Sequence, residues 1–410
     1  MAIWNRIFPW SRKSVSNSLD LFHDVYGGRL SATGRTVNLK TAIEVSTVVG
    51  CVRAIAEGIA QVPLHLKQEL PNGKKPKAKN HPLYRVLHRR PNPWQTSYEF
   101  RETLGWHVAL CGNFIAFKNV VFGKVVELIP FEPGTVTVNR ADDLTLSYLV
   151  TLQNGAQQEF PAESIWHVKG PSWNSWMGLE AVSIAREAIG LAMATEEQHA
   201  RMHKNGVKAS GVYSVEGTLK DEQFKQLRNW IEKEMGGLEN SGKPMVLDRN
   251  AKWLNTSMTG VDAQHLETRK HQIEEICRFF RVLPIMVGYS DKTATFASAE
   301  AMFLAHLVHT MSPWYEKLEQ SIDENLLTEK DRREGYYASF QEDFLLRGSL
   351  TDTKDYLLGL VNGGLMTPNE GRERLDLDPD GDPESDRLRI PANITGSVPD
   401  VNTEGAANGN

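Results

Sequence analysis

The spacing of apolar side chains is helical in two stretches near the start of the chain. From Thr41 onward, apolar residues recur every three or four positions as far as Pro63, a period that predicts an α-helix. The apolar positions are Val45, Val48, Val49, Val52, Ile55 and Ile59. Residues 94–111 show a second helical pattern. Residues 1–40 lack such a period and contain several glycines, so we expect a loosely held arm there.

Short runs of alternating apolar and polar residues follow the second helix. Gly, Pro and Asn residues separate these runs, and the combination predicts an antiparallel β region. The runs are Phe114–Val121, Val125–Ile129, Thr135–Val138, Ser147–Leu152 and Ser164–Val168. We therefore expect residues 41–180 to form one α+β domain. Gly73, which is followed by Lys74, Lys75, Lys77 and Lys79, predicts an exposed turn, and a solvated loop is favoured there over a patch that binds DNA.

Two long helical patterns bracket a small insert in the middle of the chain. The first covers Ala181–Lys204 and ends at Asn205-Gly206, a C-cap signal. The second begins at Asp262, a good N-cap, and stops before Pro284. The insert, 207–261, contains a charged helical pattern and three strand-like runs, namely Asp221–Met235, Gly211–Val215, Met245–Leu247 and Lys252–Asn255. This order places the insert at the end of a stalk of two helices.

A third helical pattern contains an internal proline. It begins at Ser298, after the polar loop Tyr289–Ala297, and continues to about Leu327. Proline removes a backbone donor and clashes with the preceding turn, so Pro313 predicts a kink near His309–Pro313. The remaining segments are expected to be a return strand, two helices and a disordered tail, at Tyr336–Leu346, Thr351–Val361, Thr367–Leu375 and from Pro391 onward.

The charge balance of the chain argues against tight binding to nucleic acid. It has 46 Lys and Arg residues against 51 Asp and Glu residues, for a net charge of −5. Proteins that grip DNA over a broad face usually have a basic excess, because their affinity comes from neutralised phosphates. Either the chain does not meet DNA, or the DNA slides past without sticking. No apolar run approaches the ~20 residues that span a bilayer, so we expect no membrane partner.

Motifs for catalysis, metals and cofactors fail on inspection. Gly237–Lys243 has the spacing of a phosphate-binding loop, but Pro244 replaces the magnesium ligand and opposes the helix that would follow. A plain turn is favoured there. Asp376–Gly381 resembles the start of a calcium loop, but its twelfth position is Arg387. His199 and His203 lie one helical turn apart without a third ligand. We therefore expect a protein that is not an enzyme, with no cofactor and no metal.

A series of short signatures resembles the portal family of tailed bacteriophages with the HK97-type capsid, over about residues 45–390. The pieces occur in the family's order, and together they are far more specific than any one alone. They are Val48–Arg53, His81-Pro82-Leu83, Pro91-Asn92, Glu99-Phe100, Gly112-Asn113-Phe114, Ile165–Lys169, Asn205-Gly206, Ser210-Gly211-Val212, Asp262–Arg269, Val287-Gly288, Ala299-Glu300, Phe344–Arg347 and Gly364–Arg372.

The resemblance implies an α+β portal fold and a dodecameric ring, a homo-oligomer around double-stranded DNA. The implied parts are an α+β wing, a stem of two helices, a small αβ clip, a kinked tunnel helix and an α-helical crown. Their boundaries are arm 1–40, wing 41–180, stem helix 181–206, clip 207–261, stem helix 262–284, tunnel loop 285–297, tunnel helix 298–330, wing return strand 331–347, crown 348–390 and disordered tail 391–410.

The resemblance also implies roles for particular residues. The tunnel loop, with Lys292, Thr293, Thr295 and Phe296, would face the DNA channel, and Pro313 would kink the tunnel helix. For Lys292, a phosphate contact and plain solvation are equally good interpretations. On the clip helix, the residues that would contact a terminase or an adaptor are Lys225, Arg228 and Glu232. Trp173 and Trp176 are interpreted as core residues in preference to contacts between subunits.

The family implies further partners and a location. The partners are the major capsid protein and scaffold, the terminase large subunit that drives packaging, and head-completion or adaptor proteins. The location is the portal vertex of the virion, after assembly in the host cytoplasm. Two alternatives belong to other classes: a nucleotide-dependent DNA-processing enzyme that uses Gly237–Lys243, or another phage shell or adaptor protein.

Overall fold

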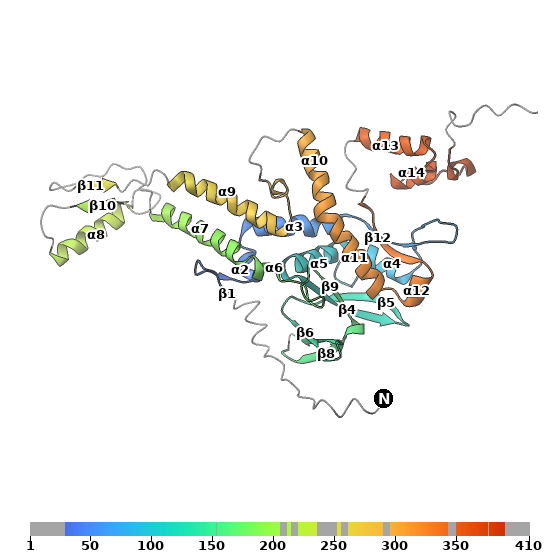
Figure 1. Ribbon diagram of the computed structural model, residues 1–410, viewed down its shortest axis with the longest axis horizontal. Helices are drawn as coiled ribbons and strands as arrows, with labels where there is room; N and C mark the ends of the chain where they lie inside the picture. The colour runs from blue at the N-terminus through green and yellow to red at the C-terminus, as the bar shows by residue number, and fades with distance from the viewer. Residues whose placement is uncertain are drawn as a thin grey trace, which may run out of the picture. The chain divides into compact units, whose positions relative to one another are not determined.

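The computed structural model of the chain combines α-helices with antiparallel sheets, which confirms the predicted α+β class (Figure 1). It describes residues 29–152, 154–205, 211–214, 220–235, 252–255, 261–289, 296–342, 350–375 and 377–389. The chain divides after Phe340 into two units, each of which is described by itself. Among the described residues, no helix is both long and apolar enough to cross a bilayer.

Helices α3 (Ser46–Gln61) and α5 (Ser97–Cys111) form the core of the first unit, as their apolar spacing predicts. Val48, Cys51, Val52, Ile55 and Ile59 of α3 are at most 2% exposed. Gly105 permits the close approach of the two helices. A Cβ atom at this position would lie 2.5 Å from the Cα atom of Ala56, closer than any side chain fits.

Three antiparallel sheets belong to the same unit as this core. One has the order β5-β4-β9, one has the order β6-β7-β8, and one pairs β3 with β12. Their strands are β3 (Leu64–Gln68), β4 (Asn113–Val121), β5 (Lys124–Pro130), β6 (Val136–Arg140), β7 (Leu146–Thr151), β8 (Gln157–Pro161), β9 (Ile165–Lys169) and β12 (Tyr336–Phe340). The five strands predicted between residues 114 and 168 are confirmed. Strands β3 and β8 and the short helix α4 (Pro82–His88) were not predicted.

The first described residues correct one expectation. Residues 29–40 belong to the segment predicted to be a loose arm, but they form a hairpin of β1 (Arg29–Leu30) and β2 (Thr36–Val37) and the start of helix α2 (Leu39–Ala42). The hairpin is held against a later helix, because the backbone N–H of Ala32 donates to Glu187 at 2.8 Å. Residues 1–28 lie outside the described part of the chain.

The predicted order of helix, insert and helix is confirmed. Helices α7 (Arg186–Asn205) and α9 (Val261–Phe280) lie side by side, in green and yellow in Figure 1. The single helix expected from Ala181 is divided into α6 (Ala181–Ile184) and α7, because Ala185 leaves helical geometry with ψ of 6°. The chain between α7 and α9 contains β10 (Gly211–Ser214), α8 (Asp221–Met235) and β11 (Lys252–Asn255). The strand expected at Met245–Leu247 lies outside the described residues.

The third long helix is interrupted close to the expected position. Helix α10 (Phe296–His306) passes through a π-helical turn, Leu307–Met311, into α11 (Ser312–Asn325). Pro313 lies in the first turn of α11, where a missing backbone N–H is tolerated. The short helix α12 (Glu329–Arg333) then leads into β12, which pairs with β3 and so returns the chain to the sheets.

The second unit contains two helices, α13 (Leu350–Asn362) and α14 (Pro368–Arg374). Thr367 and Glu370 form the capping box that the sequence predicts at the start of α14. The return strand ends at Phe340, earlier than the expected Leu346, and residues 343–349 are outside the described part. The expected disordered tail also lies outside it.

Candidate functional site

The site residues predicted from the sequence occupy two elements. Lys225 and Arg228 are exposed on α8, three positions apart and so on one side of the helix. Glu232 lies one turn further along α8, and its side chain is outside the described part of the structure. Phe296 is the first residue of α10, whereas Lys292, Thr293 and Thr295 lie outside the described residues. Their roles stay predictions.

The interrupted helix is fixed to the core at the π-helical turn. The hydroxyl of Thr310 donates to the carbonyl of Arg281, just beyond α9, at 2.6 Å. The hydroxyl of Tyr315, which is fully buried, donates to the carbonyl of Gly58 in α3 at 2.9 Å. The turn therefore links α10 and α11 to both α3 and the end of α9. π-helical turns inside α-helices are frequent at functional positions.

A buried hydrogen-bond network lies where the chain leaves the sheets and enters the helix pair. The Oδ1 atom of Asn113 in β4 accepts from the backbone N–H of Gly178 at 2.7 Å, and lies 3.0 Å from Nε2 of His167 in β9. The Nδ2 atom of Asn113 donates to the carbonyls of Cys111 and Gly178. Since Oδ1 only accepts, Nε2 of His167 carries the proton and Nδ1 accepts from the hydroxyl of Tyr148 at 3.1 Å.

Burial keeps the members of this network neutral. It lowers the pKa of His167 to about 4, with a smaller contribution from the charge of Lys169. Burial also raises the pKa of Tyr148 to about 12. At neutral pH the network therefore has one arrangement of protons: the Tyr148 hydroxyl donates to His167, and His167 donates to Asn113. It joins β7 of one sheet to β4 and β9 of another.

Two glycines allow the backbone to close around Asn113. Gly112 ends α5 with φ of +69°, and a Cβ atom there would lie 2.0 Å from the carbonyl oxygen of Leu179. A Cβ atom at Gly178 would lie 1.8 Å from the carbonyl oxygen of Gly112. Gly112-Asn113 and Ile165–Lys169 are both among the signatures quoted from the sequence. In the fold they form one junction that fixes the start of α6 and α7.

The loop 170–178 corrects the interpretation of Trp173. Its side chain is 91% exposed, so the expected core position is wrong for this residue, while Trp176 is half-buried. The loop is braced from within. The Oδ1 atom of Asn174 accepts from the backbone N–H of Met177 at 2.9 Å, and Nζ of Lys169 donates to the carbonyl of Ser175 at 2.7 Å. Trp173 is thus presented to solvent on an ordered loop.

The helix pair is anchored to α3 and to itself. The Sγ atoms of Cys51 in α3 and Cys277 in α9 lie 3.7 Å apart, and both residues are buried. The Nε2 atom of Gln272 in α9 donates to the hydroxyl of Thr195 in α7 at 3.0 Å. Gly190 of α7 admits the β1–β2 hairpin, since a Cβ atom there would lie 2.3 Å from Oγ of Ser31. Both helices are therefore held firmly at their sheet-proximal ends.

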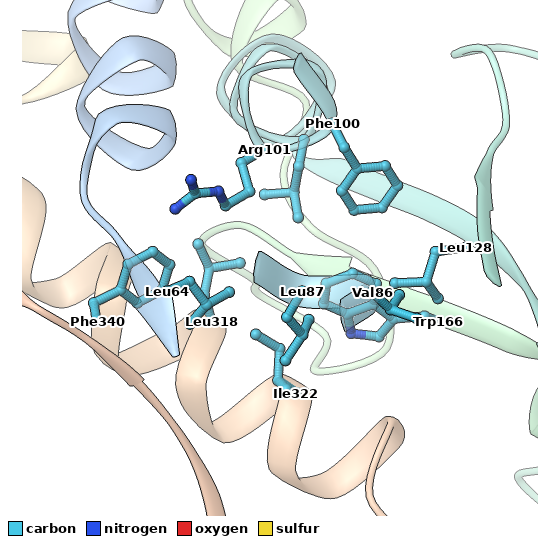
Figure 2. A pocket seen from close by; sticks show the side chains of 11 residues that line it. Leu64, Val86, Leu87, Phe100, Arg101, Leu128, Trp166, Leu318, Ile322 and Phe340 are labelled. Atoms are coloured by element: carbon cyan, nitrogen blue, oxygen red, sulfur yellow. The ribbon is translucent and has the colours of Figure 1, made fainter. Parts of the chain in front are cut away.

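The small cavity in Figure 2 is a packing feature. Ten of its lining residues are apolar, and the eleventh is Arg101. Burial lowers the pKa of Arg101 to about 10, so the guanidinium stays charged at neutral pH and donates to the carbonyls of Val62 and Ser97. The lining has no carboxylate, histidine or nucleophile. It therefore has no general acid, base or nucleophile to offer a substrate.

The sequence offered no signal for Arg101 or Tyr148, because Val62 and His167, with which they form hydrogen bonds, belong to other elements of the fold. Among the described residues, no group of three or more His, Cys, Asp or Glu side chains is placed to hold a metal ion. Gly237–Lys243 lies outside the described residues. The described geometry is that of two long helices anchored to α3 and to the β1–β2 hairpin.

Comparisons with known proteins agree with this reading of the fold. The family model described as "Phage portal protein" matches residues 46–376. The portal protein of Enterobacteria phage HK97 is 28% identical over 361 residues, which cover 86% of this chain and 84% of that protein.

Two solved structures share the fold. An HK97 family phage portal protein from Corynebacterium diphtheriae aligns with a TM-score of 0.54 at 15% identity, covering 75% of this chain and 96% of that one. A chain in the neck of a native gene transfer agent particle, computed with C12 symmetry, aligns with a TM-score of 0.54 at 21% identity, covering 90% of this chain and 95% of that one.

Proposed function

Because this chain belongs to the phage portal protein family, we propose that it forms the ring through which double-stranded DNA enters and leaves the phage head. The ring stands at one vertex of the capsid, where the head joins the tail. The observation that carries the proposal is the extent of the family match. Residues 46–376 include strands β3 to β12, both paired helices and the interrupted helix, so the match covers most of the described fold.

The proposed ring contains twelve copies. A chain with the same fold occurs in a gene transfer agent neck computed with C12 symmetry, which supports this number. Closed cyclic assembly needs two different patches on each copy, one for each neighbour. The loop that presents Trp173 offers an ordered aromatic side chain of the kind that is enriched in binding hot spots.

The DNA channel is proposed to be lined by the tunnel loop 285–297 and the helix that follows it. Lys292, Thr293, Thr295 and Phe296 are the proposed channel residues, of which Phe296 begins α10, and the tunnel helix continues to about residue 330 with its π-helical interruption before Pro313. A net charge of −5 supports passage without tight binding, because DNA affinity grows with the number of phosphates that Lys and Arg neutralise.

The clip, 207–261, is proposed to receive the packaging motor. Lys225 and Arg228 are exposed on one side of α8, and together with Glu232 they supply a charged surface for the terminase large subunit and later for a head-completion protein. The wing 41–180 and the crown 348–390 are proposed to contact the major capsid protein and the scaffold. These partners follow from the family and from the exposed charge on α8.

Sedimentation of the purified chain tests the proposal. Twelve copies of the 46.0 kDa chain give a particle of about 550 kDa. A monomer or a small oligomer at micromolar concentration would instead favour another shell or adaptor protein. ATP hydrolysis by the purified chain that is lost on Lys243→Ala would favour the enzyme alternative. We expect no hydrolysis in either form, because Pro244 opposes the helix that a phosphate-binding loop requires.

A further inference from the structure

Two of the three cysteines of the chain lie against each other in the core of the first unit. The thiol of Cys51 in α3 donates to the Sγ atom of Cys277 in α9 at 3.7 Å, although 226 residues separate them in sequence. Both side chains are at most 1% exposed. Cys111, the third, ends α5 and is half-buried. All three are free thiols, so Cys51 and Cys277 form a thiol pair.

The thiol pair lies where the helix pair meets the core. Ile276 and Phe280 pack beside Cys277 in the last two turns of α9, and they are 1% and 7% exposed. Further back along α9, Gln272 donates to the hydroxyl of Thr195 and so ties α9 to α7. A covalent bond between Cys51 and Cys277 would therefore fix the base of both helices to α3.

The hydrogen bond between the two thiols makes them chemically unequal. It lowers the pKa of Cys277, whose sulfur accepts the proton, and raises the pKa of Cys51, which donates it. The thiolate is the form of cysteine that reacts with oxidants. Cys277 is therefore the thiol that reacts first, and Cys51 is the neighbour placed to react with the product.

The end of α9 provides a route for a small oxidant to the thiol pair. Cys277 lies in the last turn of this helix, and the backbone N–H of Val282 closes the helix end by donating to its carbonyl at 2.9 Å. Arg281, between them, has φ of +56°, a conformation that favours glycine. Helix ends open more often than helix centres, and an opening here exposes the Cys277 sulfur.

We propose that the thiol pair is redox-sensitive: two thiols while the chain is made in the reducing cytoplasm of the host, and a Cys51–Cys277 disulfide once the virion has left the cell. Thiols stay reduced in cytosol, whereas disulfides persist on particles outside it. Formation of the bond needs the two sulfur atoms to approach to about 2.05 Å, which small side-chain rotations allow from their present contact. The two environments rest on the proposed function, but the bond itself does not.

A peroxide is the class of oxidant that the reaction requires. The Cys277 thiolate attacks one oxygen of hydrogen peroxide, the O–O bond breaks, and the products are a sulfenic acid and hydroxide. The hydroxide takes the proton of Cys51. The Cys51 thiolate then attacks the Sγ atom of Cys277, the S–O bond breaks, and the leaving hydroxide takes up a proton as water. Two thiols and one hydrogen peroxide thus give one disulfide and two water molecules.

Alkylation of the purified full-length chain tests the proposal. After unfolding, the untreated chain should take up three alkyl groups, one for each cysteine. After a small excess of hydrogen peroxide it should take up one, on Cys111, and the intact chain should be lighter by two hydrogen atoms. Dithiothreitol should restore three. The disulfide should also raise the melting temperature by at least about 3 °C, because it constrains the unfolded chain.

Three cysteine variants assign the reaction to the thiol pair. Cys111→Ser is the matched control and should show the same melting shift with peroxide as the wild type does. Cys51→Ser and Cys277→Ser should show no shift. The sulfenic acid on Cys277 should accumulate in Cys51→Ser, where dimedone labels it. If Cys51→Ser does not fold, Cys51→Ala keeps a small apolar side chain at this buried position and should give the same result.

Alkylation also tests the two environments. N-ethylmaleimide added to producing cells before lysis should label all three cysteines, whereas the chain from released particles should keep one reactive thiol. Three reactive thiols in the released particles would overturn the proposal.

Several other outcomes would overturn the inference. They are three alkylated cysteines after peroxide treatment, a disulfide between two chains in non-reducing gels, and a sulfinic acid on Cys277 beside a free Cys51 in the wild type. Rings that form while the thiol pair stays reduced would leave the proposed function intact. A disulfide that forms in a chain without rings would support the thiol chemistry and contradict the proposed function.

Discussion

The Oδ1 atom of Asn113 and the Nε2 atom of His167 lie 3.0 Å apart, and the same oxygen accepts the backbone N–H of Gly178 at 2.7 Å. The side-chain amide of Asn113 thus joins strands β4 and β9 to Gly178, which lies just before the helix pair. The helix pair can serve as a stalk only if its anchors are rigid, and this junction is one of them, beside the contact of Cys277 in α9 with Cys51 in α3.

Removing the Asn113 side chain should destabilise the first unit. Asn113→Ala leaves the N–H of buried His167 and that of Gly178 without their acceptor, and a buried polar group without a partner costs about 1–3 kcal/mol. Urea unfolding measures the loss. Gln158→Ala, at an exposed amide of β8, is the control and should change the free energy of unfolding by less than about 0.5 kcal/mol. Equal midpoints for both variants would contradict the junction's role.

The stability of the first unit should fall with pH below about 6.5 because of His167. Above that pH the histidine is neutral in both states. Between about 6.5 and about 4 the unfolded chain binds a proton that the folded chain, with its pKa lowered to about 4, does not bind. The free energy of unfolding therefore decreases as pH falls, by up to about 1.4 kcal/mol per pH unit for this one group.

Urea midpoints at several pH values between 7 and 4 test this dependence. His167→Gln should make the slope shallower, because one proton-binding group is gone, while buried His107, whose pKa burial also lowers to about 4, keeps its own contribution. His271→Gln, at an exposed position of α9, should leave the slope unchanged. The same slope in His167→Gln as in the wild type would assign the dependence to other groups.

Gly105→Ala should destabilise the core although it adds a single methyl group. The new Cβ atom would lie 2.5 Å from Cα of Ala56, so α3 and α5 must move apart, and overpacking of this kind costs typically about 1–3 kcal/mol. Gly359→Ala in α13 is a matched control, because no atom lies within 4 Å of its added Cβ. That variant should be neutral or slightly stabilising in thermal melts. Equal melting shifts would contradict the packing of α3 on α5.

Removing the side chain of Trp166 should lower the stability of the fold, whereas removing that of Trp173 should not. Trp166→Ala leaves a cavity in place of a side chain that is 2% exposed, and should lower the free energy of unfolding by about 3–5 kcal/mol. Trp173→Ala removes a side chain that is 91% exposed, so the folded monomer should keep its stability within about 0.5 kcal/mol. If Trp173 contacts a neighbouring copy, as we propose, its variant should form fewer rings at equal concentration. Loss of monomer stability in Trp173→Ala would contradict its exposed position.

The sequence predicted the elements that carry strong local signals. Helix α8 begins at Asp221 and ends at Met235, as predicted, because its amphipathic spacing and acidic first turn are local properties. The capping box at Thr367 and the turn at Gly73 were predicted for the same reason. Strand β8 was missed because its residues are mostly polar and exposed, so they give no apolar alternation.

Features that depend on distant contacts could not be predicted. The β1–β2 hairpin exists because Ser31 lies in the space that Gly190 leaves open, more than 150 residues away in sequence. Trp173 is exposed because Asn174 and Ser175, which has φ of +66°, turn the loop outward. Asn113 and His167 stood in recognised signatures, but the hydrogen bond that joins them becomes visible only in the fold.

Electron microscopy of the purified full-length chain tests the central claim most directly. The account predicts closed rings with an open axis and with the clip, 207–261, at the end of the helix pair. Monomers, small open oligomers or closed particles without an axial opening would contradict it.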